Sequence, residues 1–147
     1  MSSDEKLSPA ECNCHTVRAA ARHITQAYDQ FLASSGLRIT QFSILAALKR
    51  KGPLTINALA DAMVMDRTTL GRNVLPLERD GLIRIAPAAS DRRAKELCLT
   101  KAGEQRFHAA RKGWAAAQAR FERTYGGTRA ARLRGLLRAV VASDLAP

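Results

Sequence analysis

The stretch that decides the fold is residues 55–83, TINALADAMVMDRTTLGRNVLPLERDGLI. It predicts two short amphipathic helices, because apolar residues recur three and four positions apart behind a capping residue, Thr55 in the first helix and Asp66 in the second. Gly81 is expected to end the second helix in a left-handed conformation. The residues predicted to face the core are Ile56, Leu59, Ala60, Met63, Leu70, Val74 and Leu77.

A β-hairpin is predicted directly after these two helices. The segments 82–86 and 94–99 alternate apolar and polar residues, as half-buried strands do. The connecting residues 87–93, PAASDRR, are too many for a tight turn and carry three charges, so we expect them to project into solvent. Two helices followed at once by a two-stranded hairpin are the arrangement of a winged helix-turn-helix.

Two further helices are predicted on each side of this module. The first ends at Gly36, and Thr40 is expected to cap the second. Thr100 is expected to cap a long helix that Gly126 separates from the last one. Their apolar stripes are Val17, Ala21, Ile24, Tyr28 and Phe31; Phe42, Leu45 and Leu48; Phe107, Ala110, Trp114, Ala117 and Phe121; and Leu133, Leu137 and Val140. The expected fold class is mainly α with a small β-hairpin wing.

We expect one domain over residues 1–147, with the winged module at 36–101. The helices of 1–35 and 102–147 carry more apolar surface than one small winged domain can cover, so they are predicted to form a homodimer.

The charge of the chain predicts a polyanionic partner. There are 24 Lys and Arg against 13 Asp and Glu, a net charge of +11 that lies entirely after residue 48. Charge alone does not choose among nucleic acid, anionic lipid and acidic protein. No apolar run approaches the roughly 20 residues that a membrane span needs, and residues 1–11 lack the pattern of a secretory signal. We therefore expect a cytoplasmic protein without a membrane partner.

In order and spacing, four motifs resemble the MarR family of transcriptional regulators. They are Leu54-Thr55 through Leu59-Ala60, the run Leu77 to Ile83, Asp91-Arg92-Arg93, and Leu99-Thr100-Lys101-Ala102-Gly103. The resemblance implies a homodimer on a pseudo-palindromic operator in double-stranded DNA. It implies a repressor that a small aromatic or phenolic ligand, or oxidation of a thiol, releases. No enzyme, cofactor or metal site is expected, since no catalytic, phosphate-binding or complete zinc motif occurs.

The candidate DNA-binding side chains lie at the start of the helix after Asp66 and in the hairpin loop. Arginine suits guanine, asparagine suits adenine, and threonine suits phosphate or the thymine methyl. Arg93 is expected in the minor groove, its guanidinium held by Asp91. The resemblance places Thr68, Thr69 and Arg72 at the family's major-groove positions. The full set is Thr55, Arg67, Thr68, Thr69, Arg72, Asn73, Asp91, Arg92 and Arg93, with Lys95 as a further phosphate contact.

Two further sites and two alternative functions stay open. An effector pocket is expected where the dimer helices meet the DNA-reading module, lined by Tyr28, Phe42, Leu45 and Trp114. Cys12 and Cys14 stand at the start of a helix, where the helix dipole favours a reactive thiolate, so thiol or metal sensing is one alternative. Against a direct transfer of that role, the second helix offers Phe42 where the peroxide-sensing relatives use tyrosines. The other alternative is a non-specific architectural protein that contacts only phosphates.

Overall fold

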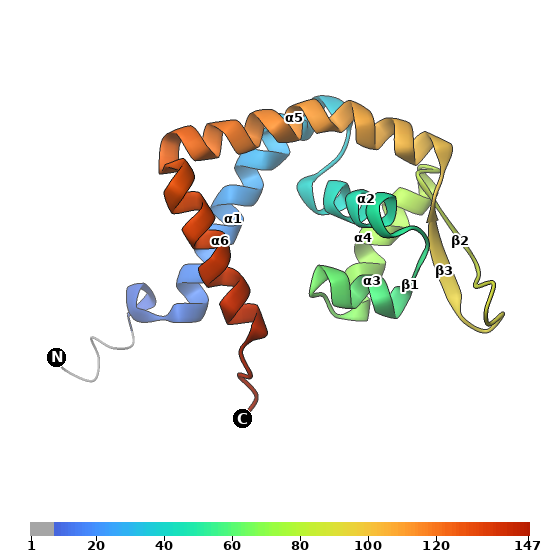
Figure 1. Ribbon diagram of the computed structural model, residues 1–147, viewed down its shortest axis with the longest axis horizontal. Coiled ribbons are helices and arrows are strands. Elements are labelled where there is room, and N and C mark those ends of the chain that lie inside the picture. Colours follow the sequence, from blue (N-terminus) through green and yellow to red (C-terminus); the bar gives the residue numbers. More distant parts are fainter. Residues whose placement is uncertain (1–7) are drawn as a thin grey trace.

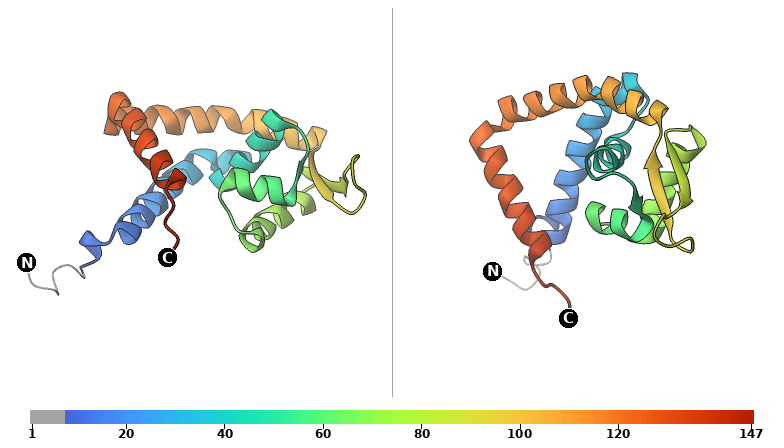
Figure 2. Two further views of the ribbon diagram at one scale, coloured as in Figure 1. Left: turned by 60° about the horizontal axis from the view of Figure 1, so that its bottom comes forward. Right: turned by 45° about the vertical axis from the view of Figure 1, so that its right-hand side comes forward.

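The computed structural model describes residues 8–147, so residues 1–7, which belong to the predicted domain and to the segment tested for a secretory signal, lie outside the described residues. The elements are η2 Pro9–Glu11, α1 Asn13–Leu32, η3 Ala33–Ser35, α2 Ile39–Lys51, β1 Leu54–Thr55, α3 Ile56–Met63, α4 Arg67–Arg79, β2 Ile83–Pro87, β3 Lys95–Leu99, α5 Lys101–Tyr125 and α6 Gly127–Ala142. The predicted fold class, mainly α with a small β wing, is confirmed. The elements α2, α3 and α4 and the strands form a winged lobe at one end of α5 (Figure 1). We call α1, α5 and α6 the helical arm, which extends away from that lobe (Figure 2).

The predicted hairpin is confirmed, because β2 pairs with β3, and a third strand, β1, which was not predicted, extends it to a three-stranded sheet. The strand order is β1-β3-β2, and both pairings are antiparallel. Within β1, Leu54 pairs with Leu97 and Thr55 with Glu96. A strand of two residues has no periodicity to detect, which is why the sequence pattern did not indicate it.

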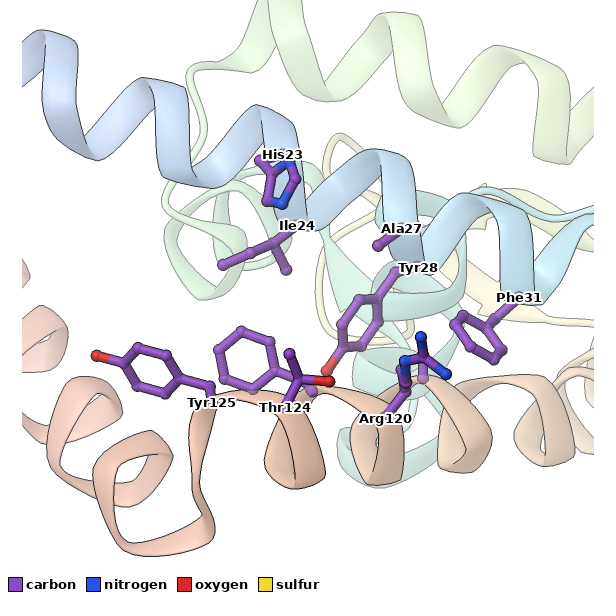
Figure 3. A pocket seen from close by; sticks show the side chains of 10 residues that line it. His23, Ile24, Ala27, Tyr28, Phe31, Arg120, Thr124 and Tyr125 are labelled. Atoms are coloured by element: carbon purple, nitrogen blue, oxygen red, sulfur yellow. The ribbon is translucent and has the colours of Figure 1, made fainter.

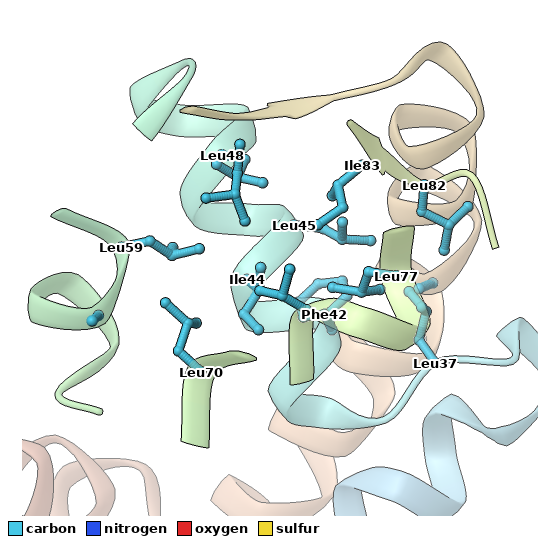
Figure 4. Close-up of a cluster of buried hydrophobic side chains, with 14 of the residues drawn as sticks. Leu37, Phe42, Ile44, Leu45, Leu48, Leu59, Leu70, Leu77, Leu82 and Ile83 are labelled. Carbon is cyan, nitrogen blue, oxygen red and sulfur yellow. The ribbon is translucent and has the colours of Figure 1, made fainter. Parts of the chain in front are cut away.

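The core of the winged lobe is built from leucines that the sequence pattern placed inside. Leu45, Leu59 and Leu70 are completely inaccessible to solvent, as is Ile44 (Figure 4). Leu97 of β3 is equally buried. Burying one such side chain contributes about 1.5–3 kcal/mol. Ile56 and Met63, also predicted inside, are half-buried against the same cluster. The predicted inward faces of α3 and α4 are therefore confirmed.

Three of the four predicted helix caps are confirmed. The side-chain oxygens of Thr55, Asp66 and Thr100 accept the backbone N–H three residues on, at 3.1, 2.7 and 3.0 Å. Thr40 is not a cap, because α2 begins at Ile39 with Arg38 in the capping position. The N–H of Ile39 donates instead to Oδ1 of Asp29, on α1, at 2.8 Å. A carboxylate ten residues away thus does what a local cap was expected to do.

The helices α1 and α5 approach each other backbone to backbone. A Cβ atom added at Gly113 of α5 would lie 2.4 Å from the carbonyl oxygen of Phe31 on α1, so this position has no room for a side chain. Next to this crossing, Leu32 of α1 and Ala110 of α5 are buried. Both side chains belong to the same buried cluster as the leucines of the winged lobe, so the helical arm is joined to that lobe by close packing as well as by the chain.

The rest of the helical arm leaves large apolar side chains uncovered. They are between 39% and 63% exposed, and they are Val17, Phe31, Leu136, Leu137, Val140 and Val141. Several of them belong to the stripes that the sequence analysis assigned to a dimer interface. Apolar residues gathered on one part of a surface mark an interaction site.

No single helix in residues 8–147 has the length and apolar composition needed to cross a membrane. Within these residues, the segment Asn13–Ser35 and helix α2 have that length and composition when they are taken together, and the angle between them is 72°. The apolar face of α2 is packed inside the winged lobe.

Substitution of Gly113 tests the helix crossing. Gly113→Ala should lower the free energy of unfolding by about 1–3 kcal/mol, because the new methyl group overlaps the backbone of α1. Gly71→Ala in α4 is the matched control, since a Cβ there meets nothing within 4 Å and alanine favours a helix. Urea denaturation followed by circular dichroism measures both, and equal stability of the two variants would contradict the crossing.

Candidate nucleic-acid interface

The first turn of α4 presents charged and polar groups to solvent. Oδ1 of Asp66 accepts the Thr69 N–H, and its Oδ2 accepts the Thr69 hydroxyl at 2.8 Å; these hydrogen bonds lower the pKa of Asp66. The hydroxyl proton of Thr69 is therefore engaged, which leaves its methyl group and a lone pair for a ligand. Arg67, Thr68 and Arg72 are exposed and have no side-chain hydrogen bond or ion pair within the described part of the chain. Their donors are available to DNA.

Asn73, predicted to read adenine, is only partly available. Its Nδ2 donates to the carbonyl oxygen of Thr69 at 2.9 Å, one turn earlier in α4. A bidentate contact with adenine uses both the amide nitrogen and the amide oxygen. The second N–H and Oδ1 can make such a contact while this bond holds, and Nδ2 is then shared between helix and base.

The wing and the two helices of the module meet around a shallow polar cleft of about 480 Å³. Thr55 and Asn57 come from the start of α3, Arg67 from the start of α4, and Arg93 and Lys95 from the wing. The structure thus brings together predicted residues from three segments of the chain. Asn57 was missed; its one signal in the sequence is its exposed position in the first turn of α3, two residues after the capping threonine.

The tip of the wing is shaped by Asp91 in a way the sequence analysis did not predict. Oδ1 of Asp91 accepts the backbone N–H of Arg93 at 3.0 Å, and among residues 8–147 no ion pair joins Asp91 to the Arg93 guanidinium. The Asp91 carbonyl accepts the N–H of Ala94 at 3.1 Å. Asp91 therefore forms a turn that fixes the backbone beneath Arg93 and leaves both Arg92 and Arg93 exposed.

A second groove, of about 430 Å³, runs beside α4. Arg72 lies on one wall, and Arg38, just before α2, lies on another with Asp29 and Thr25 of α1. Arg38 was missed by the sequence analysis. Its one signal in the sequence is that it is a basic residue just before a helix start.

The predicted effector-pocket residues do not line one pocket. Phe42 and Leu45 are buried in the core of the winged lobe, and Trp114 stacks on Phe42 with ring centroids 6.1 Å apart. Of these four predicted residues, Tyr28 is the one that lines the cavity of about 370 Å³ between α1 and α5 (Figure 3). The cavity therefore lies in the helical arm and not at the expected junction with the DNA-reading module.

Cys12 and Cys14 lie exposed at the start of α1 with free thiols. Cys12 caps this helix, since its Sγ accepts the N–H of His15 at 3.4 Å. Within residues 8–147 no three His, Cys, Asp or Glu side chains are placed to hold a metal ion together. Cys98 is half-buried in β3 and far along the chain from this pair.

Comparisons with known proteins point to DNA-binding regulators. A model of the MarR family matches residues 35–94. The M. tuberculosis transcriptional regulator MosR is 36% identical, with a TM-score of 0.78 over 92% of this chain and 100% of its own. Its structure in complex with DNA is 38% identical, with a TM-score of 0.77 over 90% of this chain and 98% of its own.

Two more distant relatives agree with this likeness. The HTH-type transcriptional regulator YwoH of Bacillus subtilis (strain 168) is 28% identical over 93 residues, which are 63% of this chain and 67% of YwoH. CouR from Rhodococcus jostii RHA1, solved bound to p-coumaroyl-CoA, is 21% identical and covers 96% of this chain and 99% of its own. Its TM-score of 0.75 shows a shared fold.

Two substitutions of Asp91 separate turn formation from charge. Asp91→Ala and Asp91→Asn add the same unit of positive charge, so a purely electrostatic binder should gain equally from both. Asparagine keeps a side-chain oxygen for the Arg93 N–H, and alanine does not. We expect Asp91→Ala to weaken binding to a selected DNA duplex by about threefold to tenfold relative to Asp91→Asn. Fluorescence anisotropy at two salt concentrations measures this, and identical affinities of the variants would contradict the turn's role.

Proposed function

The chain belongs to the MarR family of transcriptional regulators, and from this premise we propose that it is a homodimeric repressor whose operator binding is relieved by a small ligand. The family and the fold are those of transcriptional regulators, not of enzymes. The observation that carries the proposal is the convergence of Arg67, Arg93 and Lys95 around the start of α3, next to the free donors of α4.

In the proposed complex α4 lies in the major groove. Arg72 reads guanine, Thr68 contacts phosphate or a thymine methyl, and Thr69 offers its methyl group because its hydroxyl is bound to Asp66. Arg93 enters the adjacent minor groove from the tip of the wing. Thr55, Arg67, Arg92 and Lys95 contact phosphates, which set the register of the protein on the duplex.

We assign DNA binding to the winged lobe and dimerisation to the terminal helices. Residues 36–101 read DNA, and the helices of 1–35 and 102–147 hold two copies together within one domain of 1–147. The uncovered apolar side chains of α1 and α6 support this, because a second copy would cover them. Two modules related by twofold symmetry read the two halves of a pseudo-palindrome. Since its proposed partner is the genome, we place the protein in the cytoplasm.

A thiol-sensing function is a second candidate, and the exposure of Cys12 and Cys14 favours it. In the proposed step, hydrogen peroxide accepts two electrons from the two thiols: the O–O bond breaks, the S–S bond forms, and the two thiol protons complete two molecules of water. Loss of operator binding on treatment with hydrogen peroxide, in the parent protein but not in Cys12→Ser, supports this candidate. Equal responses of the two proteins reject it.

Replacing Arg72 tests base reading. Arg72→Ala should weaken binding to an operator first located by footprinting on genomic DNA by about 1–3 kcal/mol, and binding to random duplex much less, because a guanine contact exists only at the specific site. Arg79→Ala is the control, since Arg79 lies at the other end of α4 beside Asp80. An architectural protein would lose affinity equally for both duplexes, and that result would reject the proposal.

Two leucines of similar exposure test the dimer. Leu136 of α6 is 63% exposed and Leu75 of α4 is 66% exposed. Leu136→Asp should shift the protein to monomer, because a carboxylate in an apolar interface loses its hydration. Leu75→Asp should leave the oligomeric state unchanged. Multi-angle light scattering reads the mass of each variant, and a dimer that tolerates Leu136→Asp would place the interface elsewhere.

A further inference from the structure

Helix α4 exposes a large apolar side chain in the middle of its candidate DNA-reading surface. Leu75 is 66% exposed, whereas Leu70 and Leu77 of the same helix are buried and face the core (Figure 4). The exposed leucines of α6 belong to the helical arm, where the proposed second copy would cover them, but Leu75 belongs to the winged lobe. A single exposed leucine is common on protein surfaces, so its neighbours decide what it does.

The neighbours of Leu75 on α4 are residues of the candidate nucleic-acid interface. Residues three and four apart share one face of a helix, so Leu75 is adjacent to Gly71 and Arg72, and these two are adjacent to Thr68. Thr68 and Arg72 are both exposed. We call these four residues the reading face. Leu75 is its large apolar side chain.

Gly71 is a glycine that the fold itself does not require. Within a helix, glycine is less favourable than alanine. At Gly103 and Gly113 a neighbouring backbone excludes a side chain, but a Cβ atom at Gly71 would meet nothing within 4 Å in residues 8–147. Its φ also lies outside the left-handed region that favours glycine. Glycine serves a further purpose where a backbone approaches a ligand closely, and Gly71 lies on the face of α4 that is free to do so.

The major groove of DNA offers one apolar group to such a face, the C5 methyl of thymine. Leu75 provides an apolar surface for that methyl, and the missing side chain at Gly71 leaves room beside it for the base. The guanidinium of Arg72 suits the two acceptors of guanine. The reading face therefore places an apolar contact next to a guanine reader.

We propose that Leu75 and Gly71 make the protein specific for a thymine in its DNA site, Leu75 by contact with the methyl group and Gly71 by letting the helix approach the base. This proposal rests on the DNA-binding function proposed above and names two residues to which that function gives no role. Leu75 follows Arg72 by three residues, which span about 4.5 Å of helix, and one base step spans about 3.4 Å. We therefore expect the thymine within about two base pairs of the guanine that Arg72 reads.

The first experiment removes the methyl group from the DNA. Deoxyuridine in place of thymidine lacks that methyl alone and keeps the hydrogen bonds and the charge of the duplex. The parent protein first selects a duplex from a randomised pool, and each thymine of this duplex is then replaced in turn. Fluorescence anisotropy measures the affinities. We expect one thymine in each half-site whose replacement weakens binding about fourfold, as when one methyl-sized group is no longer buried.

Two variants assign this methyl contact to Leu75. Leu75→Ala should weaken binding to the selected duplex about as much, and should not respond to deoxyuridine at that position. Leu75→Met is the matched control, because it keeps an apolar chain and should still respond. Deoxyuridine without effect at every thymine overturns the proposal. Equal sensitivity of the parent and Leu75→Ala overturns it as well, since another side chain then contacts the methyl.

The selection step separates this proposal from the function on which it rests. A parent protein that selects no duplex refutes the proposed function and this proposal together. A parent protein that selects a duplex but shows no sensitivity to the methyl refutes this proposal alone.

The second experiment tests the close approach at Gly71. Gly71→Ala should raise the free energy of unfolding, because alanine favours the helix and its methyl meets nothing in the described chain. The same methyl should weaken binding to the selected duplex at least about fivefold, since it occupies space that the base needs. Binding to random duplex should hardly change, because it depends on phosphates. Urea denaturation and anisotropy measure these effects, and unchanged affinity for the selected duplex, or equal losses on both duplexes, overturns the role of Gly71.

Discussion

The architecture depends on two places where α5 meets another backbone with no side chain between them. At Gly103 a Cβ atom would lie 1.9 Å from the carbonyl oxygen of Leu82, and at Gly113 it would lie 2.4 Å from that of Phe31. The first contact holds the base of the wing, and the second holds α1. Helix α5 is therefore held to the base of the wing near its start and to α1 near its middle. A movement of α1 can therefore be transmitted through α5 to the base of the wing.

The parts of the fold that the sequence predicted are those with local causes. Helix caps act over three residues and amphipathic stripes over one or two turns, so Thr55, Asp66 and Thr100 could be assigned from sequence alone. The first N–H of α2 is satisfied by Asp29, across a turn, and no local rule indicates that. Strand β1 exists only because β3 offers its edge to Leu54 and Thr55. Both exceptions are decided by tertiary packing.

In the candidate interface, too, the sequence predicted which residues take part but not the contacts that tertiary structure gives them. Residue type and spacing were enough to propose Arg67, Arg72 and Arg93 as DNA contacts. They could not indicate that the Thr69 hydroxyl is bound to Asp66, or that Asp91 supports the backbone and not the guanidinium of Arg93. The position of the cavity was also beyond the pattern, because Phe42 and Leu45 have the same apolar periodicity whether they line a pocket or fill a core. Which of these they do depends on how α5 crosses α2.

The uncovered apolar face of α6 would make the stability of the protein depend on its concentration in the cell. If a second copy covers this face, folding and association become one equilibrium, and the thermal midpoint rises with total protein concentration by mass action. A newly made chain at low copy number would then be both less stable and less able to bind DNA. Dilution through cell division would by itself lower the share of chains that are folded and paired.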